Sequence, residues 1–452
     1  MSHIDALKLR DIGPFKDATI AFPKCANPKL ADVYLLTGPN GVGKSTALYA
    51  IADCIQGRMV KLCQTADRAV SESSLVALKS GGGEIVGTWV KPKSGEPQSI
   101  PDPSCDNKVM LPLLYDIKNN WRYWESRDGL FNKYMQNTQR FNVKALADMQ
   151  TRFSWGAFAY AGQRAMSDAT ITSIKEPQDN PFENGLSFFH TSDTAKLLNW
   201  IANQDFKRLK SKERGDNGKA QAFDENIKII EKAIQDITGS GFGFDTSGND
   251  VNVRVRWNGV VTGIEVLPDG LKSILSWIAD LLMRLDRIPW ENDTPVLERS
   301  FLLLLDEIDI HLHPAWQRKV LPIVQRLFPN AQIIATTHSP FVVASVEDAY
   351  VISLKLDETG HAVVDSCEPA RLGVSYSAVL RSIFGIDSEF DVDTEKLFGE
   401  FYAAKSELLS GTASDRSKVD DLAQKLSGRG EEVAALINIE VRQLERQLAA
   451  RK

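Results

Sequence analysis

A glycine-rich loop between an apolar strand and a helix constrains the fold of this chain more than any other feature. Residues Gly38 to Ser45 read GPNGVGKS and match the pattern G-x-x-x-x-G-K-[ST]. The apolar run Val33–Leu36 precedes the loop, and an apolar helix is predicted from about Gly43 to Ile55. Glycines let backbone N–H groups turn toward phosphate oxygens, and a helix N-terminus adds partial positive charge. The pattern therefore predicts a P-loop in an α/β protein.

The loop supplies most of the predicted nucleotide contacts. Lys44 is expected to reach the β and γ phosphates, and the hydroxyl of Ser45 is expected to hold Mg²⁺. The alternative is a glycine-rich turn that binds nothing. The strand before the motif and the helix after it argue against that alternative. The predicted nucleotide-binding residues of this segment are Gly38, Asn40, Gly41, Gly43, Lys44, Ser45 and Thr46.

A second apolar strand ends in two carboxylates. The run Phe301–Leu305 is followed directly by Asp306 and Glu307, and ligands of α/β sheets bind at the carboxyl ends of parallel strands. Asp306 is expected to complete the Mg²⁺ shell, and Glu307 to orient and deprotonate the attacking water. The alternative is a pair of solvated acids at an ordinary strand end, and the upstream P-loop argues against it.

Histidines mark the segments that follow. His338 comes directly after the apolar run Ile333–Thr337, and a neutral imidazole there can hydrogen-bond the γ-phosphate and position the water. An ordinary histidine at a strand end is the alternative, and the order of the motifs argues against it. His311 and His313 form an H-x-H pair, but the sequence places no further zinc ligand beside them.

Composition excludes several classes of protein. The chain of 452 residues is 43% hydrophobic, and its 53 basic and 59 acidic side chains give a formal net charge of −6, which is not that of a general polyanion binder. Its five cysteines include no Cys-x-x-Cys pair, so a disulfide scaffold or thiolate zinc site is not expected. The chain has no signal-peptide core and no apolar run near the ~20 residues of a membrane helix. A cytoplasmic protein with no membrane partner is therefore predicted.

Taken in order, these motifs resemble the ABC-class ATPase heads of the RecF, SMC and OLD kind. The segment Leu267–Lys272 reads LPDGLK and lies where these proteins carry their signature motif, before a helix and ahead of the acidic strand. The resemblance implies that Asp269, Gly270 and Lys272 contact a nucleotide bound by the opposite subunit, and a helix start favours anions. Pro268 departs from the family, which usually has a serine there, and a plain helix cap is the alternative.

The resemblance also assigns two further loops. Asp309 corresponds to the D-loop at a dimer interface, which we prefer to a metal site as the interpretation of the H-x-H region. The segment Ala157–Arg164 is similar in position to the Q-loop, so Gln163 is predicted to contact Mg²⁺ or the water. Arg164 is an alternative phosphate contact, and a turn without a ligand is another.

More narrowly, the chain resembles the short-armed ATPases of bacterial anti-phage systems such as Septu, PARIS and some retrons. The segment DEIDIHLHPAWQ is typical of this group, no long heptad segment precedes the signature, and the tail from Leu372 is similar. The resemblance implies a P-loop NTPase of ABC ATPase-head type, an α/β fold with a mixed sheet, an antiparallel N-terminal subdomain, a helical insertion and a helical C-terminal tail. Asp391 and Asp393 are interpreted as a solvated loop before a helix, so no nuclease domain of the OLD kind is expected.

The chain is predicted to have four parts. Residues 1–175 and 251–368 form the two halves of the head, 176–250 a helical insertion, and 369–452 a C-terminal helical region. Residues 192–238 are predicted to be helical, with a charged break at Lys210–Lys219. The predicted strand pairs are Ala6–Leu9 with Ala18–Phe22, a hairpin over Ser74–Lys93, Val251–Trp257 with Val260–Val266, and Ala349–Leu354 with Ala362–Val364.

Three functions remain open. The first is an ATPase that binds ATP and Mg²⁺, pairs head to tail with itself in a dimer or larger homo-oligomer, and acts as the sensor or regulatory subunit of an anti-phage system. It would control a separate effector, such as an HNH or TOPRIM nuclease. The second is a RecF- or SMC-like DNA-binding ATPase in repair, for which the basic run Lys207–Arg214 is the support, although such runs are usually solvated linkers. The third is a scaffold clamped by ATP without hydrolysis, against which Glu307 and His338 argue.

Overall fold

The computed structural model divides the chain into two compact units, Met1–Val379 and Leu380–Lys452, which are described separately. No helix in the described part of the chain is both long and apolar enough to cross a bilayer. The structure describes residues 3–56, 70–80, 83–89, 99–101, 110–112, 114–116, 121–124, 138, 152–162, 166, 169, 171, 173–177, 179–188, 192–248, 251–370, 373–386, 390–411 and 415–449.

A six-stranded sheet forms the centre of the first unit. In spatial order its strands are β10 (Gly156–Tyr160), β14 (Phe301–Leu305), β15 (Ala331–Thr336), β3 (Asp32–Thr37), β16 (Ala349–Leu356) and β17 (Ala362–Pro369). All neighbours are parallel except β16 and β17, which form the predicted antiparallel pair. Every residue of β10 and β14 is buried, as expected for apolar strands that are covered on both faces.

A second sheet in the same unit is antiparallel. In spatial order its strands are β2 (Phe15–Ala21), β1 (Ile4–Ile12), β4 (Val70–Ser80), β5 (Gly83–Trp89), β9 (Trp121–Trp124) and β8 (Leu114–Asp116), and a separate short pair comprises β6 (Ser99–Pro101) and β7 (Met110–Pro112). Ala6 lies opposite Ala21, and Ser80 lies opposite Gly83, which confirms both predicted hairpins. Gly81 and Gly82, which lie between β4 and β5 in the sequence, are outside the described residues.

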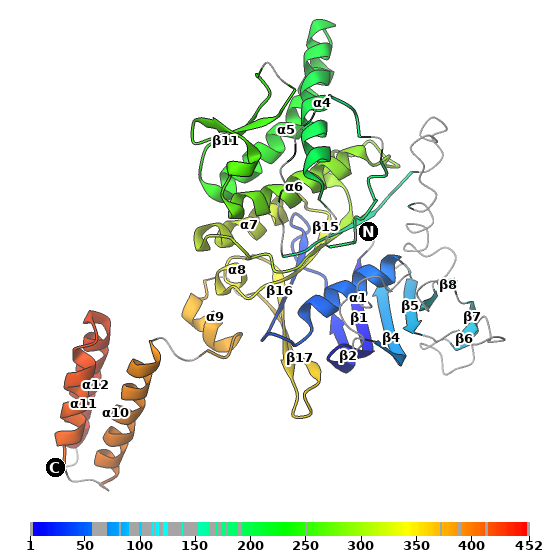
Figure 1. The fold of residues 1–452 in the computed structure, drawn as a ribbon. Helices are drawn as coiled ribbons and strands as arrows, with labels where there is room; N and C mark the ends of the chain where they lie inside the picture. Colours follow the sequence, from blue (N-terminus) through cyan, green and yellow to red (C-terminus); the bar gives the residue numbers. More distant parts are fainter. Residues whose placement is uncertain are drawn as a thin grey trace. The chain divides into compact units, whose positions relative to one another are not determined.

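Helix α1 (Lys44–Gln56) joins the two sheets. It contacts β14 and β15 of the central sheet as well as β1 and β4 of the antiparallel sheet, over which it lies in Figure 1. Its residues from Ala50 to Ile55 are all buried, so the apolar helix predicted after the P-loop is confirmed. The α/β fold with a mixed sheet and an antiparallel N-terminal part is therefore confirmed.

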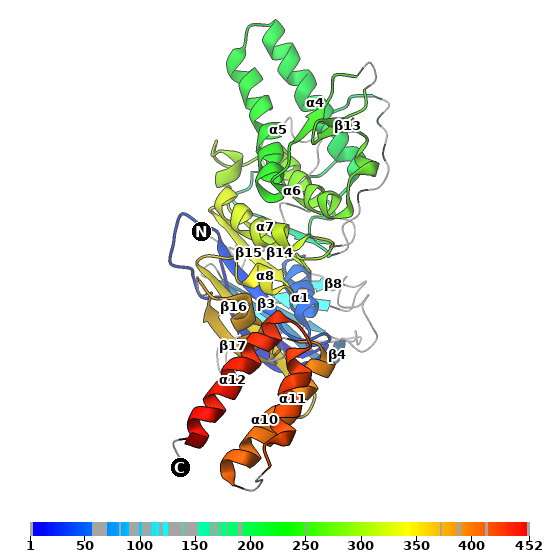
Figure 2. The same cartoon turned by 90° about the vertical axis from the view of Figure 1, so that its left-hand side faces the viewer.

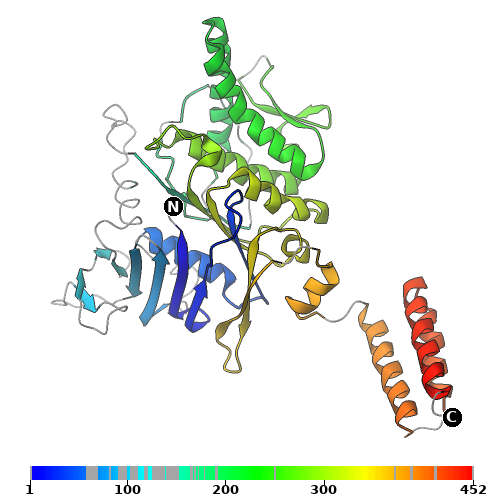
Figure 3. The same ribbon diagram turned by 180° about the vertical axis from the view of Figure 1, so that it is seen from behind.

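Three long helices gather at the end of the unit away from the antiparallel sheet (Figure 3). They are α4 (Thr194–Glu213), α5 (Asn217–Thr238) and α6 (Asp269–Arg287). The break predicted at Lys210–Lys219 is wrong in extent, because only residues 214–216 interrupt the helices. The lysines and Glu213 favour helix, and the new helix starts where the side chain of Asp216 accepts a hydrogen bond from the Lys219 N–H.

A small sheet lies beside these helices and contains β11 (Phe242–Asp245), β12 (Arg254–Trp257) and β13 (Val260–Thr262). Asn258 and Gly259 form the turn between β12 and β13, with φ of 49° and 84°. The prediction of a strand over Val260–Val266 is wrong beyond Thr262, because Ile264–Val266 forms a 3-10 helix, η2. Val260 and Val261 are exposed on an edge strand, so a longer strand would bury little additional apolar surface.

Shorter elements connect this end of the unit to the central sheet. They are η3 (Val296–Glu298), α7 (Pro314–Leu327) and α8 (Pro340–Val343). Figure 2 shows α7 between the helices α5 and α6 and the strands β14 and β15. A buried polar link also ties α6 to β10, because the Tyr160 hydroxyl donates to Asp280 over 2.8 Å and Arg284 Nε donates to the same carboxylate over 2.7 Å.

The second unit is a helical bundle with its own apolar core. It contains α10 (Val392–Ser410), α11 (Ser417–Ser427) and α12 (Glu431–Ala449), and α9 (Tyr376–Ser382) spans the boundary between the units. Phe401, Leu426 and Leu444 are fully buried in this core. Asp391 is exposed and accepts from the Thr394 N–H at the start of α10, so it lies before a helix as predicted. The prediction of a loop is wrong at Asp393, which lies in the first turn of α10. The predicted four-part division of the chain stays a prediction.

Candidate functional site

The P-loop backbone adopts conformations that favour glycine at three positions. Gly38, Gly41 and Gly43 have φ of 136°, 83° and 91°. A Cβ on Gly38 would lie 2.2 Å from the Leu354 carbonyl oxygen, and one on Gly43 would lie 2.5 Å from the Phe15 ring. Neither loop position therefore tolerates a side chain, and the turn that results leaves Asn40 and Gly41 exposed. This backbone fits the cradle that a nucleotide phosphate requires.

Lys44 begins α1 and turns its ammonium back onto the loop. Its Nζ donates to the carbonyl oxygens of Gly38 and Pro39, each over 2.9 Å, and the residue is only 7% exposed. Burial lowers the pKa of Lys44, and the nearby carboxylates of Asp306 and Glu307 oppose that shift. The cation is therefore held at the loop, where the sequence predicted its contact with phosphates.

Asp306 is the centre of the hydrogen-bond network at the end of β14. Its Oδ1 accepts from the Ser45 hydroxyl over 2.9 Å and from the Thr336 hydroxyl over 2.7 Å, and its Oδ2 accepts from the Tyr49 hydroxyl over 3.3 Å. Its backbone N–H donates to the Tyr160 carbonyl over 2.9 Å. The structure therefore brings Ser45 and Asp306, the predicted magnesium ligands, into direct contact.

This donor set fits Mg²⁺. A hydroxyl and a carboxylate are hard oxygen ligands, and Mg²⁺ usually takes only one or two protein carboxylates and completes its shell with water and phosphate. In the described ranges, no group of three or more His, Cys, Asp or Glu side chains could hold a metal ion. His313 accepts from the Ala315 N–H at the start of α7, so the structure gives this histidine a capping role. The H-x-H alternative gains no support.

Two residues of this network were missed by the sequence analysis. Thr336 ends β15, and its hydroxyl donates to Asp306 while accepting from the Glu307 N–H over 2.7 Å. Tyr49 lies on α1, where its ring packs edge-on against Phe188. A polar residue at the end of a strand next to the acidic strand is the signal that would have indicated Thr336. No comparable signal points to Tyr49.

Glu307 leaves β14 in an unusual backbone conformation. Its φ is 46°, which is rare for a residue with a side chain. A Cβ on Gly162 would lie 2.7 Å from both Cβ and Oε2 of Glu307, so the backbone after β10 packs directly against this carboxylate. Gln163 and Arg164, the predicted Q-loop contacts, lie outside the described residues.

His338 and Asp309 meet beside this carboxylate pair. Oδ1 of Asp309 accepts from the Thr337 hydroxyl over 2.6 Å and from the His338 N–H over 3.3 Å. Burial lowers the pKa of His338, the charge of Lys44 lowers it further, and the charges of Asp309 and Asp306 only partly oppose this. The neutral imidazole that the sequence predicted is therefore favoured.

The signature-like segment packs against the D-loop of its own chain. A Cβ on Gly270 would lie 2.5 Å from the His311 carbonyl oxygen, so this glycine lets α6 approach the D-loop of its own chain. Pro268 precedes α6 without a side-chain cap, and the Asp269 side chain is 82% exposed. Among the described residues, the ion pairs of Lys272 are limited to a 3.8 Å contact with Asp269. The structure therefore does not connect this segment to Lys44, Asp306 or Glu307 by a hydrogen bond or ion pair in the part it describes.

The strand order and the converging motifs define a P-loop ATPase of the ABC head type. A family model described as "AAA domain" matches residues 6–239, more than half of the sequence, and the chain belongs to this AAA-domain family. A second model, described as "AAA domain, putative AbiEii toxin, Type IV TA system", matches residues 162–344.

The chain is also similar to individual named proteins. Septu protein PtuA of Bacillus thuringiensis is 24% identical over 394 residues, which cover 86% of this chain and 85% of PtuA. Retron Ec83 probable ATPase of Escherichia coli is 30% identical over 249 residues, but this chain covers only 44% of that protein. An SMC head solved with the C-winged helix domain of ScpA aligns with 81% of this chain and 98% of its own, at 15% identity and a TM-score of 0.43. The relatives confirm the predicted resemblance to the Septu and retron ATPases.

Proposed function

We propose that the chain hydrolyses ATP with Mg²⁺ at the site formed by the P-loop and the ends of β14 and β15. The observation that carries this proposal is the direct contact of Ser45 with Asp306 beside a loop in which a Cβ on Gly38 or Gly43 would clash with neighbouring atoms. Asn40, Gly41 and Thr46 belong to the same loop and helix start, so their backbone groups and the Thr46 hydroxyl are available to phosphate oxygens.

Each side chain has a separate task in this proposal. Lys44 exchanges its carbonyl contacts for the β and γ phosphates, and Glu307 orients the attacking water and accepts its proton. His338, as a neutral imidazole, hydrogen-bonds the γ-phosphate. Ser45 and Asp306 hold Mg²⁺, which when bound neutralises charge on the phosphate oxygens. Gln163 is retained as a candidate ligand on its position in the sequence.

The second half of the site is proposed to come from another copy of the chain. Asp269, Gly270 and Lys272 lie at the start of α6, where the helix N-terminus favours an anion. The Asp269 side chain is 82% exposed and has no polar contact with the P-loop among the described residues, so it is available to a partner, whereas the Lys272 side chain is only 18% exposed. Because one chain carries both halves, two copies placed head to tail would complete two sites, with Asp309 near the interface.

The biological role is proposed from the relatives. Their names place them in Septu and retron systems, so we propose that this chain is the regulatory ATPase of an anti-phage system. It would control a separate effector, such as an HNH or TOPRIM nuclease.

The alternative of a DNA-binding repair ATPase loses much of its support. Its basis was the basic run on α4, and two of those charges are paired within the chain. Lys207 Nζ lies 2.6 Å from Glu176, and Arg208 donates to Asp205 over 2.9 Å. Lys210 lies over the Phe206 ring. The pairing of Lys207 and Arg208 lowers the positive charge that this run offers to a phosphate backbone.

The experiment that tests the proposal is steady-state ATP turnover by the purified chain. Wild type is expected to hydrolyse ATP with Mg²⁺ and to stop when EDTA removes the metal. Lys44→Ala is expected to abolish turnover, whereas the exposed Lys418→Ala should leave it unchanged. Turnover by the Lys44→Ala variant at the wild-type rate would refute the proposed site, and a wild type that binds ATP without hydrolysing it would favour the scaffold hypothesis.

A further inference from the structure

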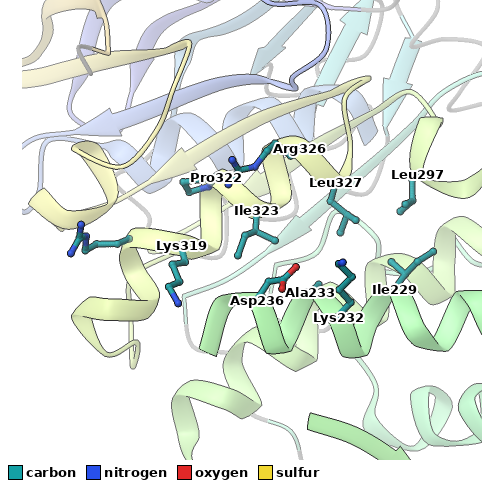
Figure 4. Close-up of a pocket in the computed structure, with 11 residues that line it drawn as sticks. Ile229, Lys232, Ala233, Asp236, Leu297, Lys319, Pro322, Ile323, Arg326 and Leu327 are labelled. Atoms are coloured by element: carbon teal, nitrogen blue, oxygen red, sulfur yellow. The ribbon is translucent and has the colours of Figure 1, made fainter. Parts of the chain in front are cut away.

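A groove of about 700 Å³ lies between α5 and α7, away from the P-loop residues. Figure 4 shows Ile323 and Leu327 on α7 and, facing them across the groove, Lys232 and Asp236 on α5. The floor is apolar, since Ala233 is buried and Ile323 and Leu327 are partly buried. None of these residues has a part in the proposed ATP site.

The rim of the groove is strongly basic. Lys232, Arg318, Lys319 and Arg326 are exposed around it, and Asp236 is the one acid among its lining residues. The lining therefore carries a formal charge of 4 − 1 = +3, on a chain whose net charge is −6. In the part of the chain that the structure describes, none of these four cations forms an ion pair, although Arg318 lies over the Tyr376 ring.

The spacing of the cations along α7 indicates an extended ligand that spans more than one charged group. Arg318 and Arg326 lie eight residues apart on α7, which corresponds to roughly 12 Å along a helix. Pro322 and Ile323 provide apolar surface between them, and Ile229 and Ala233 provide it from α5. Phosphate backbones carry charge but no apolar side chains, so a nucleic acid would leave this floor uncovered. A protein segment that alternates carboxylates with aliphatic side chains would satisfy both floor and rim.

We propose that this groove binds an acidic, amphipathic segment of a partner protein. The inference rests on the proposed role of the chain as a subunit that controls a separate protein. The partner's carboxylates would meet Lys319 and Arg326 at the rim, and its aliphatic side chains would cover Ile323. This surface belongs to the head itself, so docking here would place the partner next to α7, the helix that follows the D-loop.

The proposal can be tested with the full-length chain and a fluorescent probe. The probe is a 15-residue helical peptide of glutamate and leucine, with a lysine–leucine peptide and a glutamate–serine peptide as controls. Fluorescence anisotropy is expected to show saturable binding of the glutamate–leucine peptide only. The double variant Lys319→Glu with Arg326→Glu should weaken it by roughly tenfold or more, because it reverses two rim charges.

A matched control separates the groove from general electrostatics. Lys212→Glu with Arg214→Glu makes the same change in net charge at exposed positions near the end of α4, and should leave peptide binding as in wild type. Ile323→Ser keeps every charge and should also weaken binding, which tests the apolar floor. If the charge-reversed protein does not fold, as judged by thermal unfolding, Lys319→Gln with Arg326→Gln provides the same test.

Several results would overturn the proposal. They are absence of saturable peptide binding, equal weakening by the control pair, and displacement of the peptide by duplex DNA, which would make the groove a nucleic-acid surface. Self-association that the rim variants abolish would instead show that a second copy covers the groove. Because peptide binding is measured without ATP, and in Lys44→Ala as well as wild type, its failure is distinguishable from failure of the proposed ATPase activity.

Discussion

The P-loop region and the signature-like region of this chain are built in different ways. At the end of β14, Asp306 accepts hydrogen bonds from Ser45 and Tyr49 on α1 and from Thr336 on β15, so two other elements fix one carboxylate. At the start of α6, Gly270 only packs against the D-loop carbonyl of His311. Hydrogen bonds within the chain fix the first region. The second region packs against the D-loop through Gly270 and leaves the Asp269 side chain exposed. The contrast suggests that one chain completes the first half of the site alone, and that another molecule completes the second.

The largest expected effect comes from breaking the network at its centre. Asp306→Asn removes the negative charge that Ser45, Thr336 and Tyr49 share, and with it the proposed metal ligand. We expect ATP turnover to fall by roughly 10²–10³-fold, the range seen when a group that stabilises transition-state charge is lost. Turnover with saturating Mg²⁺ measures this, and Asp421→Asn, an exposed acid on α11, is the control that should stay active. Similar turnover in both variants would contradict the assignment.

The next effect tests the signature-like region through complementation. Lys272→Glu places a carboxylate at the start of α6, so we expect about a tenfold loss of turnover by repulsion of the phosphate bound by the partner. Lys44→Ala is inactive at its own P-loop but keeps its signature segment. Mixing the two variants should restore up to about a quarter of wild-type turnover, since half of the dimers are mixed and each has one intact site. No restoration in the mixture would mean that each chain works alone.

A smaller effect is expected at Thr336. Thr336→Val keeps the shape of the side chain but removes the hydroxyl that donates to Asp306 and accepts from the Glu307 N–H. Each buried polar group left without a partner costs about 1–3 kcal/mol, so the midpoint of thermal unfolding should fall together with turnover. Thr262→Val, at the end of a strand outside the site, is the matched control. An unchanged midpoint and unchanged turnover would show that this hydroxyl is dispensable.

The smallest effect concerns pH. The pKa of His338 lies below the ordinary value of 6.5, so the imidazole stays neutral at pH 7 and gains its proton only on further acidification. Turnover per enzyme should therefore be constant from about pH 8 down to 6.5 and decrease below that, as His338 becomes charged. The His338→Gln variant should have a lower turnover, and its pH profile should lack the part of the low-pH decrease that His338 causes. A His338-dependent decrease centred above pH 6.5 would contradict the direction of the shift.

The sequence alone predicted most of the fold, together with the P-loop and the acidic strand end of the proposed site. The apolar strands and the loop from Gly38 to Ser45 were predictable because spacing alone specifies them. Thr336 and Tyr49 were not, because their hydrogen bonds to Asp306 cross 30 and 257 residues and depend on which strands become neighbours. Local propensity also misread Ile264–Val266, whose β-branched residues suggested a strand although they lie in a 3-10 turn.

The groove shows the same limit. Three of the four rim cations lie on α7, which carries no acidic residue, and Lys232 on α5 adds the fourth. The basic character of α7 is visible in the sequence, but the groove forms only because α5 packs against α7. Assembly of a surface from separate helices is tertiary information, which no single stretch of sequence contains.

The most direct test of the central claim separates ATP binding from hydrolysis at Glu307. The Glu307→Gln variant keeps the size of the side chain but cannot accept the proton of the attacking water. We predict that it binds ATP with Mg²⁺ as wild type does, measured by calorimetric titration, while its steady-state turnover falls by about 100-fold or more. Turnover at the wild-type rate, with binding intact, would contradict the account of this chain as an ATPase that uses Glu307.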